Sequence, residues 1–299
     1  MTSLSYPQRR IWFAESLVGA SSTYNIPMMF EIGGDIDRDA LTGAVSDVLG
    51  RHEVLRTLIR DTAGVPEVGY ARELEPTVSF VHTTVQDEQA RVSSDIQAPF
   101  DLSVELPLRC TLYERSETGR GSLLVFVFHH IVADDHSLHI FMRDFGEFYT
   151  ARAQGVRPVL PDLKASYADF ADWQMRPDTP ELDPEYWRAQ LAGIPEEIFL
   201  PRDHARSATA SHEGGWVDFD LTSAASDALR GLAKETRATN FMVWHAALAA
   251  LMYRLGAGTD VVLGTVSSGR PTGDFRDVIG CFVNTLALRG DLSGNPTFR

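Results

Sequence analysis

The residues LLVFVF at positions 123–128 run directly into HHIVADDHS at positions 129–137. Six apolar residues in a row, without polar alternation, are typical of a strand that is buried on both faces of a covered sheet. The two histidines therefore lie where this strand ends. Apolar residues at helical spacing then predict a helix over residues 136–153. The sequence thus places two imidazoles and the carboxylate of Asp134 at a strand-to-helix corner.

Composition and charge exclude several classes of protein. The 299 residues are 44% hydrophobic and 23% charged, close to the globular average, so extensive disorder is not expected. A formal net charge of −14, without any basic stripe, argues against nucleic-acid binding. Two cysteines, Cys110 and Cys281, are too few for a disulfide framework or a zinc site.

Hydropathy argues against a membrane protein. The longest apolar run, residues 241–253, is well short of the roughly 20 residues that a bilayer span needs. The first residues lack the apolar core of a secretory signal. We therefore expect an acidic protein that resides in the cytoplasm.

Helices and strands alternate in both halves of the chain. Helix caps and periodicity predict helices that start after Ser5 and Asp37, and the remaining expected elements follow the same criteria. The expected strands are 27–32, 55–59, 108–113, 216–221, 261–266 and 281–289, and the expected later helices are 165–174, 222–237 and 240–255. This alternation predicts an α/β fold, built as two α+β two-layer sandwiches.

A segment rich in proline and acidic residues separates the two halves. We expect an N-terminal lobe at 1–160 that carries the two histidines, an inter-lobe bridge at 161–184, and a C-terminal lobe at 185–299.

The strand-to-helix corner is the candidate site. A neutral imidazole there can accept or hold a proton near neutral pH. The alternative is a packing role, because a histidine at a strand end is usually a satisfied structural residue. A metal site is the weaker interpretation: His130 and Asp134 could reach an ion, but no neighbour completes a ligand set.

Five sequence blocks together carry a resemblance to a known family. HHIVADDHS resembles the HHxxxDG motif of condensation domains from nonribosomal peptide synthetases, within the chloramphenicol-acetyltransferase-like superfamily. The other four blocks follow in the family's order: SYPQRRIWF at 5–13, RHEVLRT at 51–57, YADFADWQ at 167–174 and IGCFVNTLALR at 279–289. The resemblance covers the whole chain, which is identified as a member of this family.

The resemblance implies two chloramphenicol-acetyltransferase-like lobes in a V, with a tunnel between them. Donor and acceptor peptidyl carrier proteins would dock at the two mouths, and each would deliver a 4′-phosphopantetheine arm. The implied enzyme is of the acyltransferase type and makes amide bonds in antibiotic biosynthesis, beside an adenylation domain of the same synthetase. It implies no intrinsic cofactor or metal, and a monomer when excised. Family domains continue beyond the FVNT residues, so the second lobe is expected to be incomplete in this chain.

The resemblance also assigns roles to the histidines. His130 matches the tunnel-facing second histidine, which could act as a general base or could position the amine and stabilise the tetrahedral species. An α-amine, with a pKa of about 7.7–8.0, is already partly neutral near pH 7–8. Positioning with partial proton acceptance is therefore favoured. His129 matches the first histidine and is expected to point away and brace the loop.

Other motif residues are expected to support the site. Asp134 matches the family's structural aspartate, which pairs with an arginine; Arg56 is the first candidate partner and Arg270 the second. Ser137 belongs to the same corner. Asn284 is expected to tie strand backbone across the lobes.

Two residues depart from the family pattern. Asp135 replaces the usual glycine, and His136 replaces the usual aromatic residue. The Asp134–Asp135 doublet resembles the family's inactive recruitment domains, which bind a tailoring oxygenase, although those have usually lost the second histidine. Three functions therefore stay open: amide-forming condensation first, then a catalytically silent docking platform, then a stand-alone acyltransferase that uses a soluble acceptor or a coenzyme A donor.

Overall fold

The computed structural model describes residues 3–19, 21–71, 78–115, 121–176, 183–205, 215, 217–271, 273–294 and 296–298. The chain divides into two compact units. The first contains Met1–Pro180 and Ser267–Asn284, and the second contains Glu181–Val266 and Thr285–Arg299. The segment Ser267–Asn284, here called the return segment, was expected in the C-terminal lobe. It belongs instead to the first unit, as do residues 161–176 of the expected bridge, whereas residues 183 and 184 belong to the second unit.

A four-stranded sheet organises the first unit. Its order is β1 (Asn25–Ile32), β6 (Ser122–His129), β5 (Leu108–Arg115) and β4 (Val78–Thr83). Strand β6 runs antiparallel to both β1 and β5, whereas β4 is parallel to β5. The predicted strand at 123–128 is confirmed, and it lies in the interior of the sheet with residues 124–129 buried. Strand β4 was not predicted.

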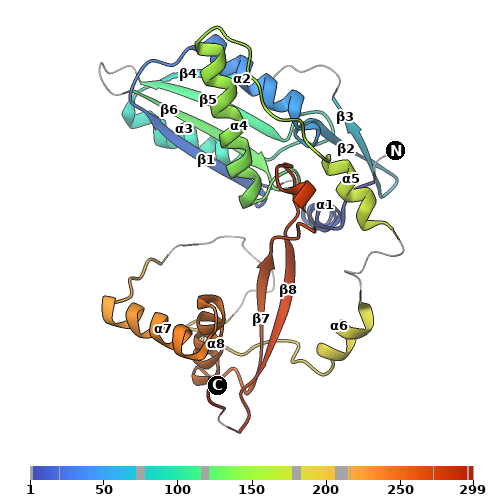
Figure 1. Ribbon diagram of the computed structural model, residues 1–299, viewed down its shortest axis with the longest axis vertical. Helices are drawn as coiled ribbons and strands as arrows, with labels where there is room; N and C mark the ends of the chain where they lie inside the picture. The colour runs from blue at the N-terminus through green and yellow to red at the C-terminus, as the bar shows by residue number, and fades with distance from the viewer. Residues whose placement is uncertain are drawn as a thin grey trace. The chain divides into compact units, whose positions relative to one another are not determined.

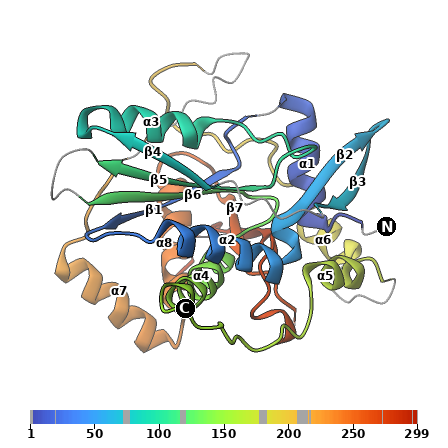
Figure 2. The same cartoon turned by 90° about the horizontal axis from the view of Figure 1, so that it is seen from above.

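Helices cover both faces of this sheet (Figures 1 and 2). Helices α2 (Arg38–Arg51) and α4 (Asp135–Ala153) lie on one face, and α3 (Val85–Gln97) lies on the other. Phe126 and Phe128 of β6 belong to the core beneath α4, where both rings meet Phe141 edge to face. Val125 and Val127 belong to a second cluster on the α3 side. Such alternation explains why β6 contains no polar residue between Leu123 and Phe128.

The ends of the first helices follow from their caps. Ser5 and Gln8 form a capping box before α1 (Tyr6–Val18), and Asp37 accepts from the Ala40 amide before α2. Both predicted helix starts are confirmed. The expected strand at 55–59 is only partly right, because η1 (Glu53–Arg56) precedes a hairpin of β2 (Thr57–Thr62) and β3 (Val65–Tyr70).

Two further elements complete the first unit. Helix α5 (Tyr167–Gln174) begins at its Ser166 cap, and the one-turn helix η2 (Gly273–Phe275) lies within the return segment.

The second unit contains α6 (Pro184–Gln190), α7 (Ser223–Thr236), α8 (Asn240–Arg254) and a two-stranded sheet of β7 (Asp260–Ser267) and β8 (Asn284–Asp291). The strand expected at 216–221 is wrong. Trp216 lies outside the described residues, and 217–221 have no regular structure. Val217 and Phe219 are 89% and 80% exposed, so no neighbour buries an alternate face here. Strand β8 starts at Asn284, the last residue of the return segment, and not at residue 281 as expected.

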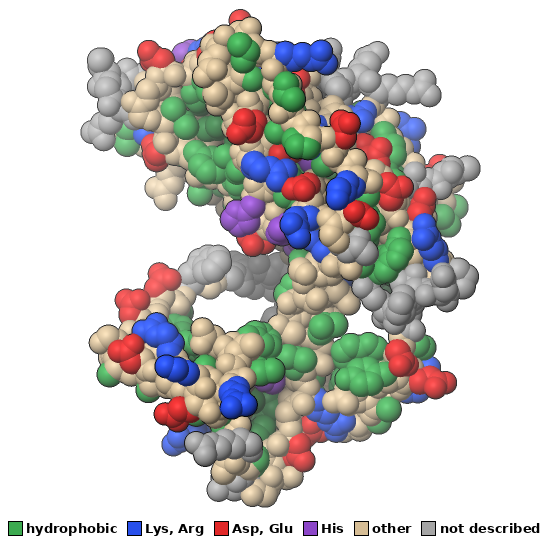
Figure 3. Space-filling model, viewed as in Figure 1, with side chains coloured by type: hydrophobic (Ala, Val, Ile, Leu, Met, Phe, Trp, Pro, Cys, Tyr) green, Lys and Arg blue, Asp and Glu red, His purple; other side chains and the backbone are tan. Residues whose placement is uncertain are grey.

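Helix α8 leaves apolar side chains open to solvent, and Figure 3 shows hydrophobic surface in the region of α7 and α8. Its large exposed residues are Phe241, Met242, Trp244, Leu248, Leu251 and Tyr253. Within the described ranges, no helix combines the length and hydrophobicity that crossing a membrane requires.

Candidate functional site

Asp134 starts helix α4 and at the same time holds the return segment. Its Oδ1 accepts from the Ser137 amide at 2.9 Å, which satisfies one of the free amides of the first turn. Its Oδ2 accepts from the Phe282 amide at 3.0 Å. Only 1% of Asp134 is exposed. The carboxylate therefore joins the strand-to-helix corner to residues nearly 150 positions later in the chain.

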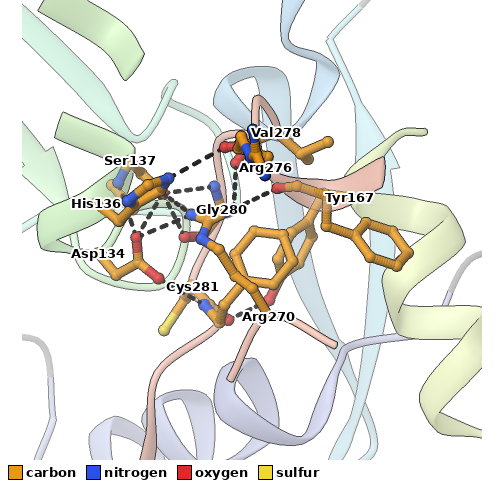
Figure 4. Close-up of polar contacts among 12 residues, drawn as sticks. Asp134, His136, Ser137, Tyr167, Arg270, Arg276, Val278, Gly280 and Cys281 are labelled. Carbon is orange, nitrogen blue, oxygen red and sulfur yellow. Dashed lines mark hydrogen bonds and ion pairs between the residues drawn. The ribbon is translucent and has the colours of Figure 1, made fainter. Parts of the chain in front are cut away.

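Arg270 is the cation beside Asp134 (Figure 4). Its Nη2 lies 3.2 Å from Asp134 Oδ1 and 3.0 Å from Ser137 Oγ. Its Nη1 donates to the carbonyl oxygens of Phe275 and Val278 at 2.7 and 2.8 Å. The guanidinium lies 3.9 Å from the centre of the Phe282 ring. Burial lowers the pKa of Arg270 from its ordinary value, and the neighbouring Asp134 carboxylate opposes that shift.

Arg56, the first candidate partner of Asp134, is not its partner. It lies at the end of η1 and donates from Nη1 to the Ala71 carbonyl oxygen at 3.3 Å. The physical reason is the fold of the return segment, which brings Arg270 back to the first unit. Arg270 was the second candidate, and the structure assigns the ion pair to it.

Ser137 and Tyr167 hold the same segment through its backbone (Figure 4). Ser137 Oγ lies 2.8 Å from the Gly280 carbonyl oxygen and accepts from the Gly280 amide at 3.1 Å. Tyr167 donates to the Cys281 carbonyl oxygen at 2.5 Å, and its hydroxyl oxygen lies 2.7 Å from Ser5 Oγ. A Cβ atom on Gly280 would lie 1.9 Å from the Tyr167 ring, so only glycine fits there. The sequence block that contains Tyr167 gave no indication of either hydrogen bond.

Both ring nitrogens of His129 have hydrogen-bond partners within the protein. Its Nδ1 accepts from the Ile131 amide at 3.2 Å, so the neutral ring carries its proton on Nε2, which lies 3.0 Å from Glu15 Oε1. The ring is 1% exposed and contacts Tyr24 and Phe100. His129 therefore connects the end of β6 to helix α1, in the bracing position expected of it.

His130 is held differently. Its Nδ1 lies 2.8 Å from the Ala133 carbonyl oxygen, and because a carbonyl only accepts, Nδ1 carries the proton. Nε2 of the neutral ring then has a free lone pair and makes no hydrogen bond to any described residue. The side chain is half-buried, and its backbone amide donates to the Tyr24 carbonyl oxygen at 2.8 Å. The ring is thus fixed in orientation while one nitrogen stays available to a ligand.

Cys281 lies behind His130, with its Sγ 3.9 Å from His130 Nδ1. Burial raises the pKa of the Cys281 thiol to about 12, so this side chain stays protonated at neutral pH. It offers His130 a neutral, weakly polar neighbour and no thiolate nucleophile.

The two departures from the family pattern fit the backbone. Asp135 is the first residue of α4 and is exposed. The only described non-glycine residues with positive φ are Ala63 and Arg237, so position 135 does not need glycine's conformational freedom. An acidic residue in a first helical turn also interacts favourably with the helix dipole. His136 Nε2 lies 3.1 Å from the Arg276 carbonyl oxygen and adds a further link to the return segment.

Asn284 was expected to tie strand backbone through its side chain, but its side chain contacts Arg10 instead. Its Oδ1 accepts from Arg10 Nη1 at 2.8 Å, and it is Arg10 Nη2 that reaches backbone, at the Val283 carbonyl oxygen 3.1 Å away. Asn284 lies at the exposed start of β8, where the side chain of Arg10 in α1 is its hydrogen-bond partner.

Comparisons with known proteins identify relatives of the chain. The condensation domain family matches residues 1–299. The chain is 42% identical to the probable non-canonical nonribosomal peptide synthetase CymA of Salinispora arenicola, over 99% of this chain and 4% of that protein. It is 36% identical to the phosphinothricin tripeptide synthetase PhsC of Streptomyces viridochromogenes, over 99% of this chain and 28% of that protein. The chain therefore spans a small part of these relatives.

Solved structures confirm the chloramphenicol-acetyltransferase-like α/β fold. The X-domain in a complex with OxyB from teicoplanin biosynthesis matches with a TM-score of 0.90 and 32% identity, over 99% of this chain and 66% of that chain. The first condensation domain of the CDA synthetase matches with a TM-score of 0.75 and 20% identity, over 99% and 72% of the two chains.

Proposed function

This chain belongs to the condensation domain family of nonribosomal peptide synthetases, and we propose that it joins two carrier-bound substrates through an amide bond. The donor is an aminoacyl or peptidyl thioester, and the acceptor is the α-amine of an aminoacyl group on a second carrier protein. The observation that carries the proposal is the orientation of His130, whose Nδ1–H is held by the Ala133 carbonyl and whose Nε2 lone pair stays available.

In the proposed step, the acceptor nitrogen attacks the thioester carbonyl carbon. The C–N bond forms, the C–S bond breaks, and the donor arm leaves as a thiolate that takes up a proton. His130 Nε2 accepts a hydrogen bond from the amine and directs its lone pair at the carbonyl. As positive charge develops on nitrogen, Nε2 takes the amine proton, and the resulting imidazolium passes it to the departing sulfur. The Ala133 carbonyl stabilises the ring in both protonation states, since Nδ1 donates to it throughout.

Asp134 and Arg270 have a positioning role in this scheme. Both side chains are nearly inaccessible, at 1% and 8% exposed, so neither can contact a carrier-bound substrate. They hold the corner that carries His130 against the return segment. Ser137 and Tyr167 add to the same attachment through the backbone of Gly280 and Cys281.

The proposed setting is a cytoplasmic synthetase. The phosphopantetheine arms come with the donor and acceptor carrier proteins, which would deliver them to His130, and an adenylation domain loads the acceptor. The curated relatives support this setting, because they are named as nonribosomal peptide synthetases.

The decisive experiment mixes the 299-residue chain with an alanyl- or leucyl-loaded donor carrier and a glycyl-loaded acceptor carrier. Intact mass of the acceptor carrier reports amide formation. We expect the acceptor to gain the donor acyl mass. If product appears equally when coenzyme A thioester replaces the donor carrier and free glycine replaces the acceptor, the chain is a stand-alone acyltransferase. If no combination gives product, the condensation assignment is wrong.

A docking platform is the second candidate. The observation that favours it is the likeness to the X-domain, at 32% identity and a TM-score of 0.90, together with the Asp134–Asp135 doublet. Co-elution of this chain with OxyB on size exclusion, combined with no amide formation from any loaded pair, would support it. His130 and its ordered tautomer favour condensation, because a pure platform does not need an oriented imidazole.

A further inference from the structure

Arg56 does not pair with Asp134, and its surroundings are unusual. Its guanidinium is half-buried, yet it makes a single hydrogen bond, to the Ala71 carbonyl oxygen. Its Nε–H is buried and has no acceptor. No carboxylate of the described residues lies within ion-pair distance of it. Buried charged donors are normally satisfied, and each exception calls for a physical explanation.

A cavity lies beside this arginine. Its volume is about 390 Å³, and η1, the segment 163–169 and the return segment line it. The lining residues that matter are Arg56, Arg51, Glu53, Lys164, Ala165 and Asp169. All of them belong to the first unit.

The other charged residues of the lining do not compensate Arg56. Arg51 is already engaged, because its Nε donates to Asp144 at 2.9 Å and its Nη2 to the Pro161 carbonyl oxygen. The Asp169 carboxylate accepts from the amide and hydroxyl of Ser166 at the start of α5. Glu53 forms no ion pair with Arg56. The cavity therefore contains a guanidinium that has no carboxylate partner among the described residues, and a second cation, Lys164, whose side chain is 77% exposed and whose Nζ lies 4.0 Å from Asp274 Oδ1.

We propose that this cavity binds a small oxyanion, a carboxylate or a phosphate, through Arg56. The planar guanidinium fork matches two oxygens of such a group, and charge-assisted hydrogen bonds of this kind are stronger than neutral ones. Lys164 can approach the same anion from the rim. The site does not include His130, so it is independent of the amide-forming activity.

The test is calorimetric titration of the 299-residue chain with inorganic phosphate and, separately, with acetate, at constant ionic strength set with sodium chloride. We expect saturable one-to-one binding of at least one of the two anions, and the stronger of them identifies the ligand chemistry. Arg56→Gln should weaken binding about tenfold or more, as expected for loss of a charge-assisted hydrogen bond. Arg60→Gln, an exposed arginine of the adjacent strand β2, should leave it unchanged. Glu53→Gln should tighten anion binding, because it removes a negative charge from the cavity wall.

The proposal is overturned if neither anion binds saturably to the wild-type chain, or if Arg56→Gln binds as tightly as the wild type. Should Arg56→Gln fail to fold, Ala165→Leu decides the question, since it fills the lining without touching the guanidinium. Lost binding with an unchanged circular dichroism spectrum supports the site, and retained binding overturns it.

Discussion

Arg270 and Asp134, 136 positions apart in the chain, form a buried ion pair with 3.2 Å between Nη2 and Oδ1. Asp134 caps the helix that follows the paired histidines, and Arg270 comes from the return segment. One interaction therefore fixes both the local turn and the attachment of a distant segment. Both side chains are nearly inaccessible to solvent. Removing one of them therefore leaves the other as an unpaired buried charge.

We expect Asp134→Ala and Arg270→Ala each to lower the free energy of unfolding by about 3–5 kcal/mol, the range for removing one member of a buried pair. The double variant should lose clearly less than the sum of the two single losses, because the second substitution removes an already unpaired charge. Urea denaturation measures all three.

Arg56→Ala is the matched control for this cycle. It should combine additively with Asp134→Ala, since Arg56 contacts Ala71 and not Asp134. Additivity between Asp134 and Arg270, or strong coupling between Asp134 and Arg56, would contradict the assigned pair.

Gly280→Ala tests the fit of the return segment against Tyr167. The added Cβ would lie 1.9 Å from the Tyr167 ring, which is buried and held by two hydrogen bonds. We expect a loss of about 1–3 kcal/mol, typical of overpacking in a core. Gly146→Ala in α4 meets nothing within 4 Å and should be neutral or stabilising, because alanine is the better helix former. Equal thermal shifts for the two variants would contradict the close approach.

His52 and Asp144 make stability depend on pH. Burial lowers the pKa of His52 from its ordinary 6.5, although the hydrogen bond to Asp144 opposes this. The unfolded chain therefore takes up this proton at a higher pH than the folded chain does. The stability it contributes is complete above about pH 6.5 and is lost as pH falls from there toward the lowered folded value.

Unfolding free energies between pH 7.5 and 5 should therefore fall less steeply for His52→Gln than for the wild type. An identical pH slope in the two proteins would show that His52 does not contribute.

Local sequence patterns predicted the strand-to-helix corner of the site. The unbroken apolar run into His129 fixed β6 and the corner, and Asp37 and Ser5 marked their helices, because these signals depend on a few neighbouring residues. The partner of Asp134 could not be chosen from sequence, since Arg56 and Arg270 offer the same charge and only the path of the return segment distinguishes them. The tautomers of His129 and His130 likewise depend on Ile131 and Ala133 backbone geometry, which has no signature in residue type.

The strand expected at 216–221 failed for a related reason. Its alternating residues Val217 and Phe219 suit a half-buried strand, but burial depends on a partner strand that the described residues do not supply. A strand pattern is a statement about packing as much as about backbone preference.

The most direct test of the proposed chemistry is the single-turnover rate of amide formation between two loaded carriers for wild type, His130→Ala and His136→Ala. If His130 Nε2 positions the amine and accepts its proton, His130→Ala should slow the reaction by about 10²–10⁴-fold with little change in thermal stability. His136, an exposed histidine of the same stretch, should be replaceable with little effect on the rate. Wild-type rates in His130→Ala would contradict the assignment of His130 as the catalytic residue.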